Sequence, residues 1–221
     1  MRVATRLRAA GYEVFTLTLT GLGGERFHLA NPSVDVNTHI RDIVATIENE
    51  ELSGVVLCGH SYAGMVITGV ADRVPDRIAH LVYLDAFIAE NGKSALELLT
   101  PEIATAVRAE ARVHADGAKR SQPFTPEGVG VFDPADQAWL KRRLVEMPLA
   151  CHDTKISLTG AGARVPRRTD VYCNDPVIGG FERFAEATKK DSRWRYVELK
   201  TGHDAMISAP KELADLLLRA S

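Results

Sequence analysis

Gly59-His60-Ser61-Tyr62-Ala63-Gly64 connects two segments with different hydrophobic patterns. The run 54–58 before it (Gly-Val-Val-Leu-Cys) is short and apolar, like a buried strand, and the run 65–74 after it is typical of a helix. A nucleophilic serine at such a turn has a strained backbone, which requires small residues two positions before and two positions after it. Gly59 and Ala63 meet this requirement. The stretch therefore predicts a nucleophile, Ser61, on a strand-to-helix turn of an α/β fold.

A nucleophilic serine needs a base, and His203 has the most suitable position in the chain. It follows the alternating run 194–199 and precedes a helix predicted over 211–219 with one leucine-rich face. Such a loop lies at the carboxyl edge of a sheet, where open α/β folds form their sites. His60 is interpreted as a supporting or packing residue, because neighbours on a tight turn point in different directions.

The third member of this kind of triad is an acid that lies between the serine and the histidine in chain order. Asp175 fits best, because it closes the predicted strand 169–175 just before Pro176. Asp85, which ends the earlier run 78–84, is the alternative. In a triad the serine attacks an acyl carbon, the histidine moves the proton, and the carboxylate holds the imidazole tautomer.

The remaining histidines and the cysteines give no sign of a metal site or another cofactor. The cysteines Cys58, Cys151 and Cys173 are scattered, and neither residue type has the spacing of a metal-ligand set. Three cysteines cannot all pair with one another, so a reducing cytoplasm is the expected compartment. We predict no metal and no cofactor.

Four stretches give the chain a resemblance to a known family: 17–23, 59–67, 81–87 and 201–204. The chain resembles the α/β-hydrolase superfamily, and within it the small bacterial esterases akin to plant methyl esterases and hydroxynitrile lyases. The resemblance implies a mostly parallel, doubly wound sheet with a helical lid, Ser61 as nucleophile, His203 as base and Asp175 at the acid position. Relatives usually have Gly where this chain has Ala63. His60 and Asp204 stand where hydroxynitrile lyases generally have Glu and Lys, which favours an esterase.

The resemblance also implies that initial strands are missing from this chain. In the family, one of these strands carries a His-Gly pair and a loop that helps to bind the oxyanion, whereas this chain has no His-Gly pair and opens at Met1 in a predicted helix. We therefore expect the N–H of Tyr62 to be the remaining oxyanion donor and the backbone of residues 55–58 to be unpaired on one side. A chain shortened in this way is expected to be weakly active and poorly stable.

Helical and strand-like patterns alternate along the chain, as expected for repeated βα units. The predicted elements before the nucleophile are a helix over 1–10, a strand over 12–19 and a helix over 36–51; Pro75 ends the helix after it, and a strand follows over 78–85. The alternation stops over 88–164, which we interpret as an inserted helical lid with helices near 94–115 and 134–145. Within it, Trp139 and Phe124 are predicted to border an apolar substrate pocket.

Length and composition are those of one globular domain over residues 1–221 that contains this lid. The chain is 45% hydrophobic with a net charge of −2, and its basic clusters are short, so we expect no nucleic-acid partner. A secretion signal and a membrane-spanning run are both lacking, so no membrane partner is expected. The predicted function is hydrolysis of a small, largely hydrophobic carboxylic ester. A hydroxynitrile lyase-like enzyme, a noncatalytic ligand-binding protein and assembly into a homodimer remain alternatives to test.

Overall fold

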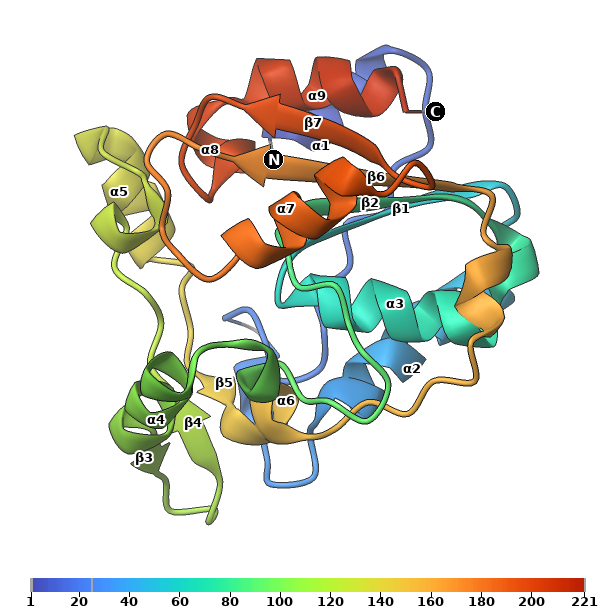
Figure 1. Cartoon of the computed structure of the whole chain (residues 1–221). Helices are drawn as coiled ribbons and strands as arrows, with labels where there is room; N and C mark the ends of the chain where they lie inside the picture. The colour runs from blue at the N-terminus through green and yellow to red at the C-terminus, as the bar shows by residue number, and fades with distance from the viewer. Residues whose placement is uncertain (1, 25, 221) are drawn as a thin grey trace.

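The computed structural model describes residues 2–24 and 26–220 and has an α/β fold built around a parallel sheet (Figure 1). The sheet has four strands in the order β1-β2-β6-β7. These strands are β1 (Val55–Ser61), β2 (Ile78–Ala86), β6 (Arg167–Cys173) and β7 (Arg195–Leu199). All three strand pairings are parallel, so the carboxyl ends of the strands meet at one edge of the sheet.

Helices cover both faces of the sheet (Figure 1). One face carries α1 (Arg2–Ala9) and α9 (Pro210–Leu218), which pack against each other. The opposite face carries α2 (Val36–Asn49), α3 (Ala63–Arg73) and α7 (Glu182–Lys190). The predicted helices before and after the nucleophile strand and at the carboxyl end are therefore confirmed within a few residues. Met1, with which the first helix was predicted to begin, lies outside the described residues.

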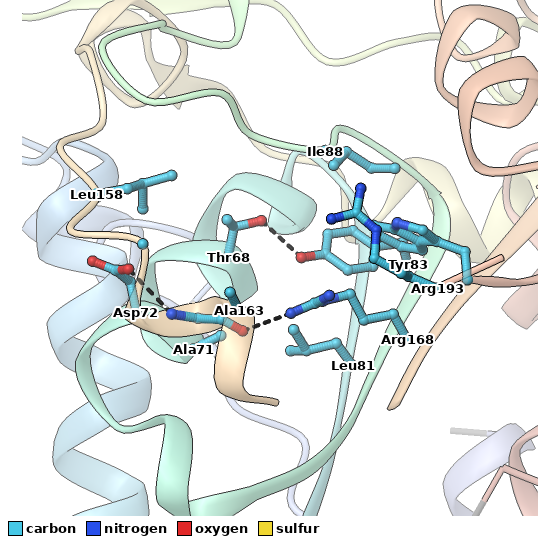
Figure 2. Close-up of a pocket in the computed structure, with 13 residues that line it drawn as sticks. Thr68, Ala71, Asp72, Leu81, Tyr83, Ile88, Leu158, Ala163, Arg168 and Arg193 are labelled. Carbon is cyan, nitrogen blue, oxygen red and sulfur yellow. Dashed lines mark hydrogen bonds between the residues drawn. The ribbon is translucent and has the colours of Figure 1, made fainter. Parts of the chain in front are cut away.

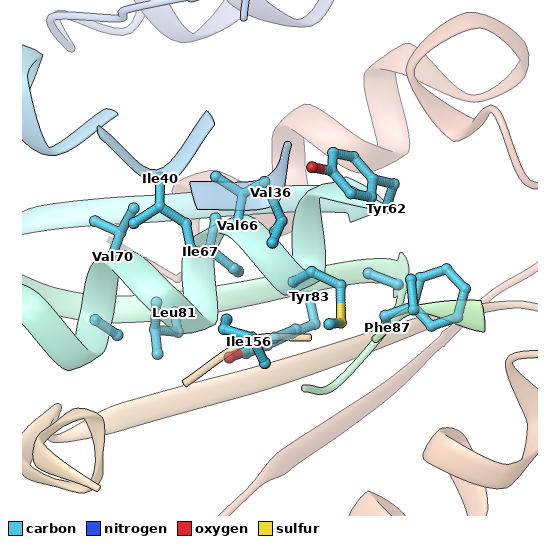
Figure 3. Close-up of a cluster of buried hydrophobic side chains, with 14 of the residues drawn as sticks. Val36, Ile40, Tyr62, Val66, Ile67, Val70, Leu81, Tyr83, Phe87 and Ile156 are labelled. Atoms are coloured by element: carbon cyan, nitrogen blue, oxygen red, sulfur yellow. The ribbon is translucent and has the colours of Figure 1, made fainter. Parts of the chain in front are cut away.

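The central elements follow directly from local sequence. The Asp35 side chain accepts the N–H of Thr38 and begins α2, while Pro75 cannot continue a helix and follows the end of α3. Because α3 is apolar on nearly every side, it is buried between α2 and the sheet. Figure 3 shows this core; its buried members include Val36, Ile40, Val66, Val70, Leu81 and Ile156. Burial of this apolar surface is the main force that holds α2 and α3 on the sheet.

The predicted strand over 12–19 is wrong as a sheet strand. The segment between α1 and the loop at Thr20 is extended but joins no ladder, and Tyr12, Phe15 and Leu17 are each more than 40% exposed. Its alternating pattern is real, but a strand also needs a neighbouring backbone with which to pair. Among the described residues, β1 is an edge strand that pairs only with β2. The expectation that residues 55–58 have an unpaired side is therefore confirmed.

The chain between β2 and β6 is an insertion of short, irregular elements, so the loss of alternation predicted over 88–164 is confirmed. Its part as a lid stays a prediction. It contains η3 (Leu96–Leu98), α4 (Pro101–Glu110), β3 (Arg112–Val113), β4 (Lys119–Ser121), η4 (Glu127–Val129), α5 (Pro134–Lys141), β5 (Met147–Pro148), α6 (Leu149–Asp153) and η5 (Ala161–Arg164). Helix α4 is much shorter than the predicted helix 94–115. The small antiparallel sheet β3-β4-β5 was not predicted, because its strands have only two or three residues each.

The remaining short elements are η1 (Phe27–Leu29), η2 (Pro75–Arg77) and α8 (Ala205–Ser208). Of these, α8 matters for the site, because it begins two residues after His203 and leads into α9. No helix in the described part of the chain is both long and apolar enough to cross a membrane.

Candidate active site

Ser61 lies at the carboxyl end of β1 in a left-handed backbone conformation, with φ of 54°. A side chain at Gly59 would place its Cβ 2.7 Å from the carbonyl oxygen of Ala63, so only glycine allows strand and helix to pass at this distance. At Gly64 a Cβ would lie 2.0 Å from the carbonyl oxygen of Phe87, which follows β2. The predicted strained turn with small flanking residues is thus confirmed.

His203 lies in the loop between β7 and α8, and its ring is fixed by a buried carboxylate. The Nδ1 of His203 lies 2.6 Å from Oδ2 of Asp85, and the two side chains are only 4% and 2% exposed. The other carboxylate oxygen, Oδ1, accepts the backbone N–H of Cys173 at 3.3 Å. With Nδ1 bonded to the carboxylate, Nε2 of His203 is left as the nitrogen that can accept a proton.

Asp175 does not lie against His203, and the expectation that it holds the imidazole is wrong. Its side chain is 58% exposed, and its nearest ionic partner is the Lys200 ammonium, at 3.9 Å. Strand β6 ends at Cys173, and the next two backbone N–H groups bond to the carbonyl oxygens of Leu199, the last residue of β7, and of Thr201. Asp175 is therefore carried along the protein surface, whereas Asp85 ends a strand that is buried over nearly its whole length.

Burial governs the ionisation of this pair. Loss of solvation raises the pKa of the Asp85 carboxyl to about 6 and lowers the pKa of the His203 imidazole. At neutral pH the imidazole is therefore uncharged and able to accept a proton. The Asp85 carboxylate, with its N–H donor from Cys173, is then ionised and able to stabilise the imidazolium that proton transfer would form.

His60 and Phe181 hold the His203 loop and ring in place. The Nε2–H of His60 donates to the backbone oxygen of His203 at 3.0 Å, and the centres of the two imidazole rings are 4.3 Å apart. The Phe181 ring stacks on the His203 ring at 5.1 Å with an interplanar angle of 14°. These contacts agree with the prediction that His60 is a supporting or packing residue. Phe181 was not predicted, because nothing in the sequence of the loop before α7 indicates which residue reaches the site.

Three potential metal ligands also meet here: His60, His203 and Asp204 have ligand atoms that all lie within 4.8 Å of one another. This grouping was not visible in the sequence spacing. The Nε2 of His60 must carry a proton to donate to the His203 carbonyl, and a metal bound at that nitrogen would displace the proton. The observed contacts are those of a hydrogen-bonded loop.

Tyr62 is the N-cap residue of α3. The backbone N–H groups at the start of a helix have no acceptor within the helix, so the Tyr62 N–H can donate to a substrate. Its side chain is fixed beneath the turn. The Nε2–H of His39 donates to the carbonyl of Thr20 at 2.9 Å, which leaves Nδ1 to accept the Tyr62 hydroxyl at 3.0 Å. The predicted oxyanion donor is therefore on a rigid residue beside Ser61.

The insertion touches the loop of the predicted base. The N–H of Asp204 donates to the carbonyl of Val129 at 3.2 Å. Gly130 and Gly202 pack backbone to backbone, so that a Cβ on Gly202 would lie 2.6 Å from the Cα of Gly130. The position of His203 therefore depends on a segment about 70 residues away in the sequence.

The two residues predicted to border the substrate have different surroundings. Trp139 on α5 packs with Val129, Val131, Leu140 and Ile207, and the Arg143 guanidinium lies 4.0 Å from the centre of its ring. Phe124 is 65% exposed. Packing explains the position of Trp139, while the part of both residues in substrate binding remains a prediction.

Comparison with known proteins agrees with this fold. The model of the alpha/beta hydrolase family matches residues 1–216, and the chain belongs to this family. It is 40% identical over 221 residues to a carbendazim hydrolyzing esterase from Nocardioides sp. (strain SG-4G), covering 97% of this chain and 90% of that protein. The predicted superfamily is thus confirmed.

Solved structures give the same fold. An extracellular alpha/beta-hydrolase from a Paenibacillus species superposes with a TM-score of 0.84 at 23% identity, covering 100% of this chain and 92% of that chain. A methylesterase from Arabidopsis superposes with a TM-score of 0.76 at 20% identity, covering 99% and 91%. At this level of identity the likeness concerns the fold.

Proposed function

We propose that the protein is a serine carboxylic-ester hydrolase in which Ser61 is the nucleophile, His203 the base and Asp85 the acid. The observation that carries this proposal is the buried His203–Asp85 pair, 2.6 Å apart, at the same sheet edge as the strained Ser61 turn. A structural histidine does not require a buried carboxylate, and a structural serine does not require a left-handed backbone. A buried carboxylate and a strained serine backbone both cost stability, and such costs are expected where they serve catalysis.

The proposed reaction has two half-reactions. The Ser61 Oγ attacks the ester carbonyl carbon while Nε2 of His203 takes the hydroxyl proton, and the N–H of Tyr62 donates to the developing oxyanion. The proton then passes to the departing alcohol, leaving an acyl-serine. A water molecule, deprotonated by His203, attacks the acyl carbon and releases the carboxylic acid. Throughout, Asp85 keeps the proton of His203 on Nδ1 and stabilises the imidazolium.

The proposed substrates are small, largely hydrophobic esters, including esters with an aromatic part. Phe87, Phe181 and Phe184 form an aromatic cluster that reaches the His203 ring through Phe181, so one side of the base is apolar. The relative from Nocardioides, described as an esterase, supports ester hydrolysis for this chain.

A substrate panel tests the proposal. The purified chain is assayed with p-nitrophenyl esters, aromatic methyl esters and mandelonitrile, beside Ser61→Ala as the control. We expect ester turnover by the parent chain and a loss of several orders of magnitude in the variant. Turnover of mandelonitrile without ester hydrolysis would instead indicate a lyase, and no turnover with either class would indicate a noncatalytic binding protein.

Covalent labelling tests the nucleophile independently of the true substrate. Treatment with a fluorophosphonate should give one adduct by intact mass, located on the peptide that contains Ser61. Labelling that persists at the same level in Ser61→Ala rules out the assignment.

A further inference from the structure

A separate cavity of about 280 Å³ lies between α3, β2 and the start of β6 (Figure 2). Its lining includes Thr68 and Asp72 of α3, Tyr83 of β2 and Arg168 of β6. Ser61, His203 and Asp85 are not part of the lining. The cavity is thus distinct from the proposed catalytic residues.

Most of the cavity wall is apolar and partly aromatic. Leu81, Ile88 and Leu158 supply aliphatic surface. The Trp194 ring, which is half-buried, contacts Tyr83 with the ring centres 5.2 Å apart. A flat apolar group of the size of one benzene ring would find both an aromatic neighbour and an aliphatic floor here.

The lining contains a positive charge, on Arg168, that no carboxylate of the described residues pairs with. Arg168 is half-buried and donates to the carbonyl of Gly162 at 2.8 Å, but takes part in no ion pair within residues 2–24 and 26–220. Its guanidinium has five N–H donors, so most of them remain for a ligand. Arg193 also borders the cavity, but Asp191 binds it with N–O distances from 2.6 to 3.1 Å.

Asp72 is the acidic residue of the lining, and its carboxylate is already bound. Oδ2 accepts the N–H of Thr159 at 2.6 Å and Oδ1 accepts that of Gly162 at 3.2 Å. These bonds hold η5 and the loop before it, and they partly satisfy the negative charge of Asp72. The ligand group best matched to the remaining Arg168 donors is therefore an anion, and a planar carboxylate fits a guanidinium best.

We propose that this cavity binds a small planar aromatic carboxylate, with its ring beside Trp194 and its carboxylate on Arg168. The site contacts α3, the helix that begins two residues after Ser61, so an occupant would lie against an element of the nucleophile turn. The proposal does not depend on ester hydrolysis, because it rests on the cavity and its charges.

Tryptophan fluorescence tests the proposal directly. The chain has two tryptophans, so Trp139→Phe leaves Trp194 as the sole reporter. After Ser61 is blocked with a fluorophosphonate, this variant is titrated with 4-nitrobenzoate as quencher and with 4-nitrobenzamide as its neutral counterpart. We expect saturable quenching in which the carboxylate binds at least about tenfold more tightly than the amide, the difference expected from a charge-assisted bond.

Two arginine variants locate the site. Arg168→Met keeps the aliphatic stem and should weaken 4-nitrobenzoate binding about tenfold or more. Arg164→Met is the matched control, because Arg164 pairs with Asp76 outside the lining, and should leave binding unchanged. If Trp139→Phe does not fold, saturation-transfer NMR with the same ligands on the parent chain and on both arginine variants replaces the fluorescence. Equal binding of acid and amide, equal binding to Arg168→Met, or no saturable binding overturns the proposal.

Discussion

One aspartate lies at the carboxyl end of β2 and another lies two residues after β6, and their surroundings differ sharply. Asp85 is 2% exposed, with its two oxygens on His203 and on the Cys173 N–H, whereas Asp175 is 58% exposed and its nearest ionic partner is Lys200. Each closes a strand-like run in the sequence, and the pattern there favoured Asp175 over Asp85. The difference shows that an acid at a strand end becomes a partner for a histidine only where burial and a fixed donor prepare its carboxylate.

The largest expected effect comes from exchanging each aspartate for its amide. Asp85→Asn should lower kcat by about a thousandfold or more, because the amide can hold the wrong tautomer of His203. Asp175→Asn, the matched control, should change kcat less than about twofold, since surface substitutions away from the site have small effects. Steady-state kinetics on a p-nitrophenyl ester measures both. A larger loss in Asp175→Asn would mean that Asp175, and not Asp85, is the acid that orients His203.

The second prediction disturbs the loop that brings His203 to Asp85. In Gly202→Ala the new methyl meets the backbone of Gly130 at 2.6 Å, so the loop or the insertion must move. We expect kcat to fall about a hundredfold from a displacement near 1 Å, and stability to fall by about 1–3 kcal/mol. Gly24→Ala is the control, because no atom lies within 4 Å of its added Cβ. Thermal melting and turnover are measured together, and equal values for both variants would contradict the prediction.

The third prediction concerns His60 as a positioning residue. His60→Phe keeps a ring beside His203 but removes the donor to its carbonyl, and should lower kcat about tenfold while KM stays nearly constant. His60→Gln, which retains an N–H donor, should recover part of the loss. A fall in thermal stability with no change in kcat would show that His60 only packs.

The fourth prediction is the pH dependence of the pair. Because burial raises the pKa of Asp85 to about 6 and lowers that of His203, kcat/KM should be constant above neutrality and fall as pH decreases through about 6, where the carboxylate takes up a proton. In Asp85→Asn this inflection should disappear from the residual activity. An unchanged inflection in the variant would assign it to another group.

The smallest expected effect belongs to the exposed end of β6. Lys200→Met removes the 3.9 Å contact with Asp175, and the free energy of unfolding should change by less than about 0.5 kcal/mol. Urea unfolding of this variant beside the parent chain measures the change. A loss above about 1 kcal/mol would mean that the Lys200–Asp175 pair stabilises the fold more than an exposed ion pair is expected to.

The fold and half of the site could be predicted from local sequence. The strand–turn–helix around Ser61, the ends of α3 and the loop of His203 depend on glycine, proline and hydrophobic period, which act over a few residues. The predicted strand over 12–19 failed for the opposite reason. Its alternation of apolar residues is local, but pairing depends on a neighbouring strand, which the described residues do not supply.

By itself the sequence indicated the family, through the four stretches that resemble it. The strained position of Ser61 and the place of His203 after a late strand follow from residue size and hydrophobic period along the chain. Only the tertiary structure decided between Asp85 and Asp175 and brought Phe181 and Gly130 to the His203 loop. The physical reason is that hydrogen-bond partners and solvation are properties of the packed chain. Two aspartates with the same place in the sequence pattern thus acquire opposite surroundings, one sealed against an imidazole and one open to water.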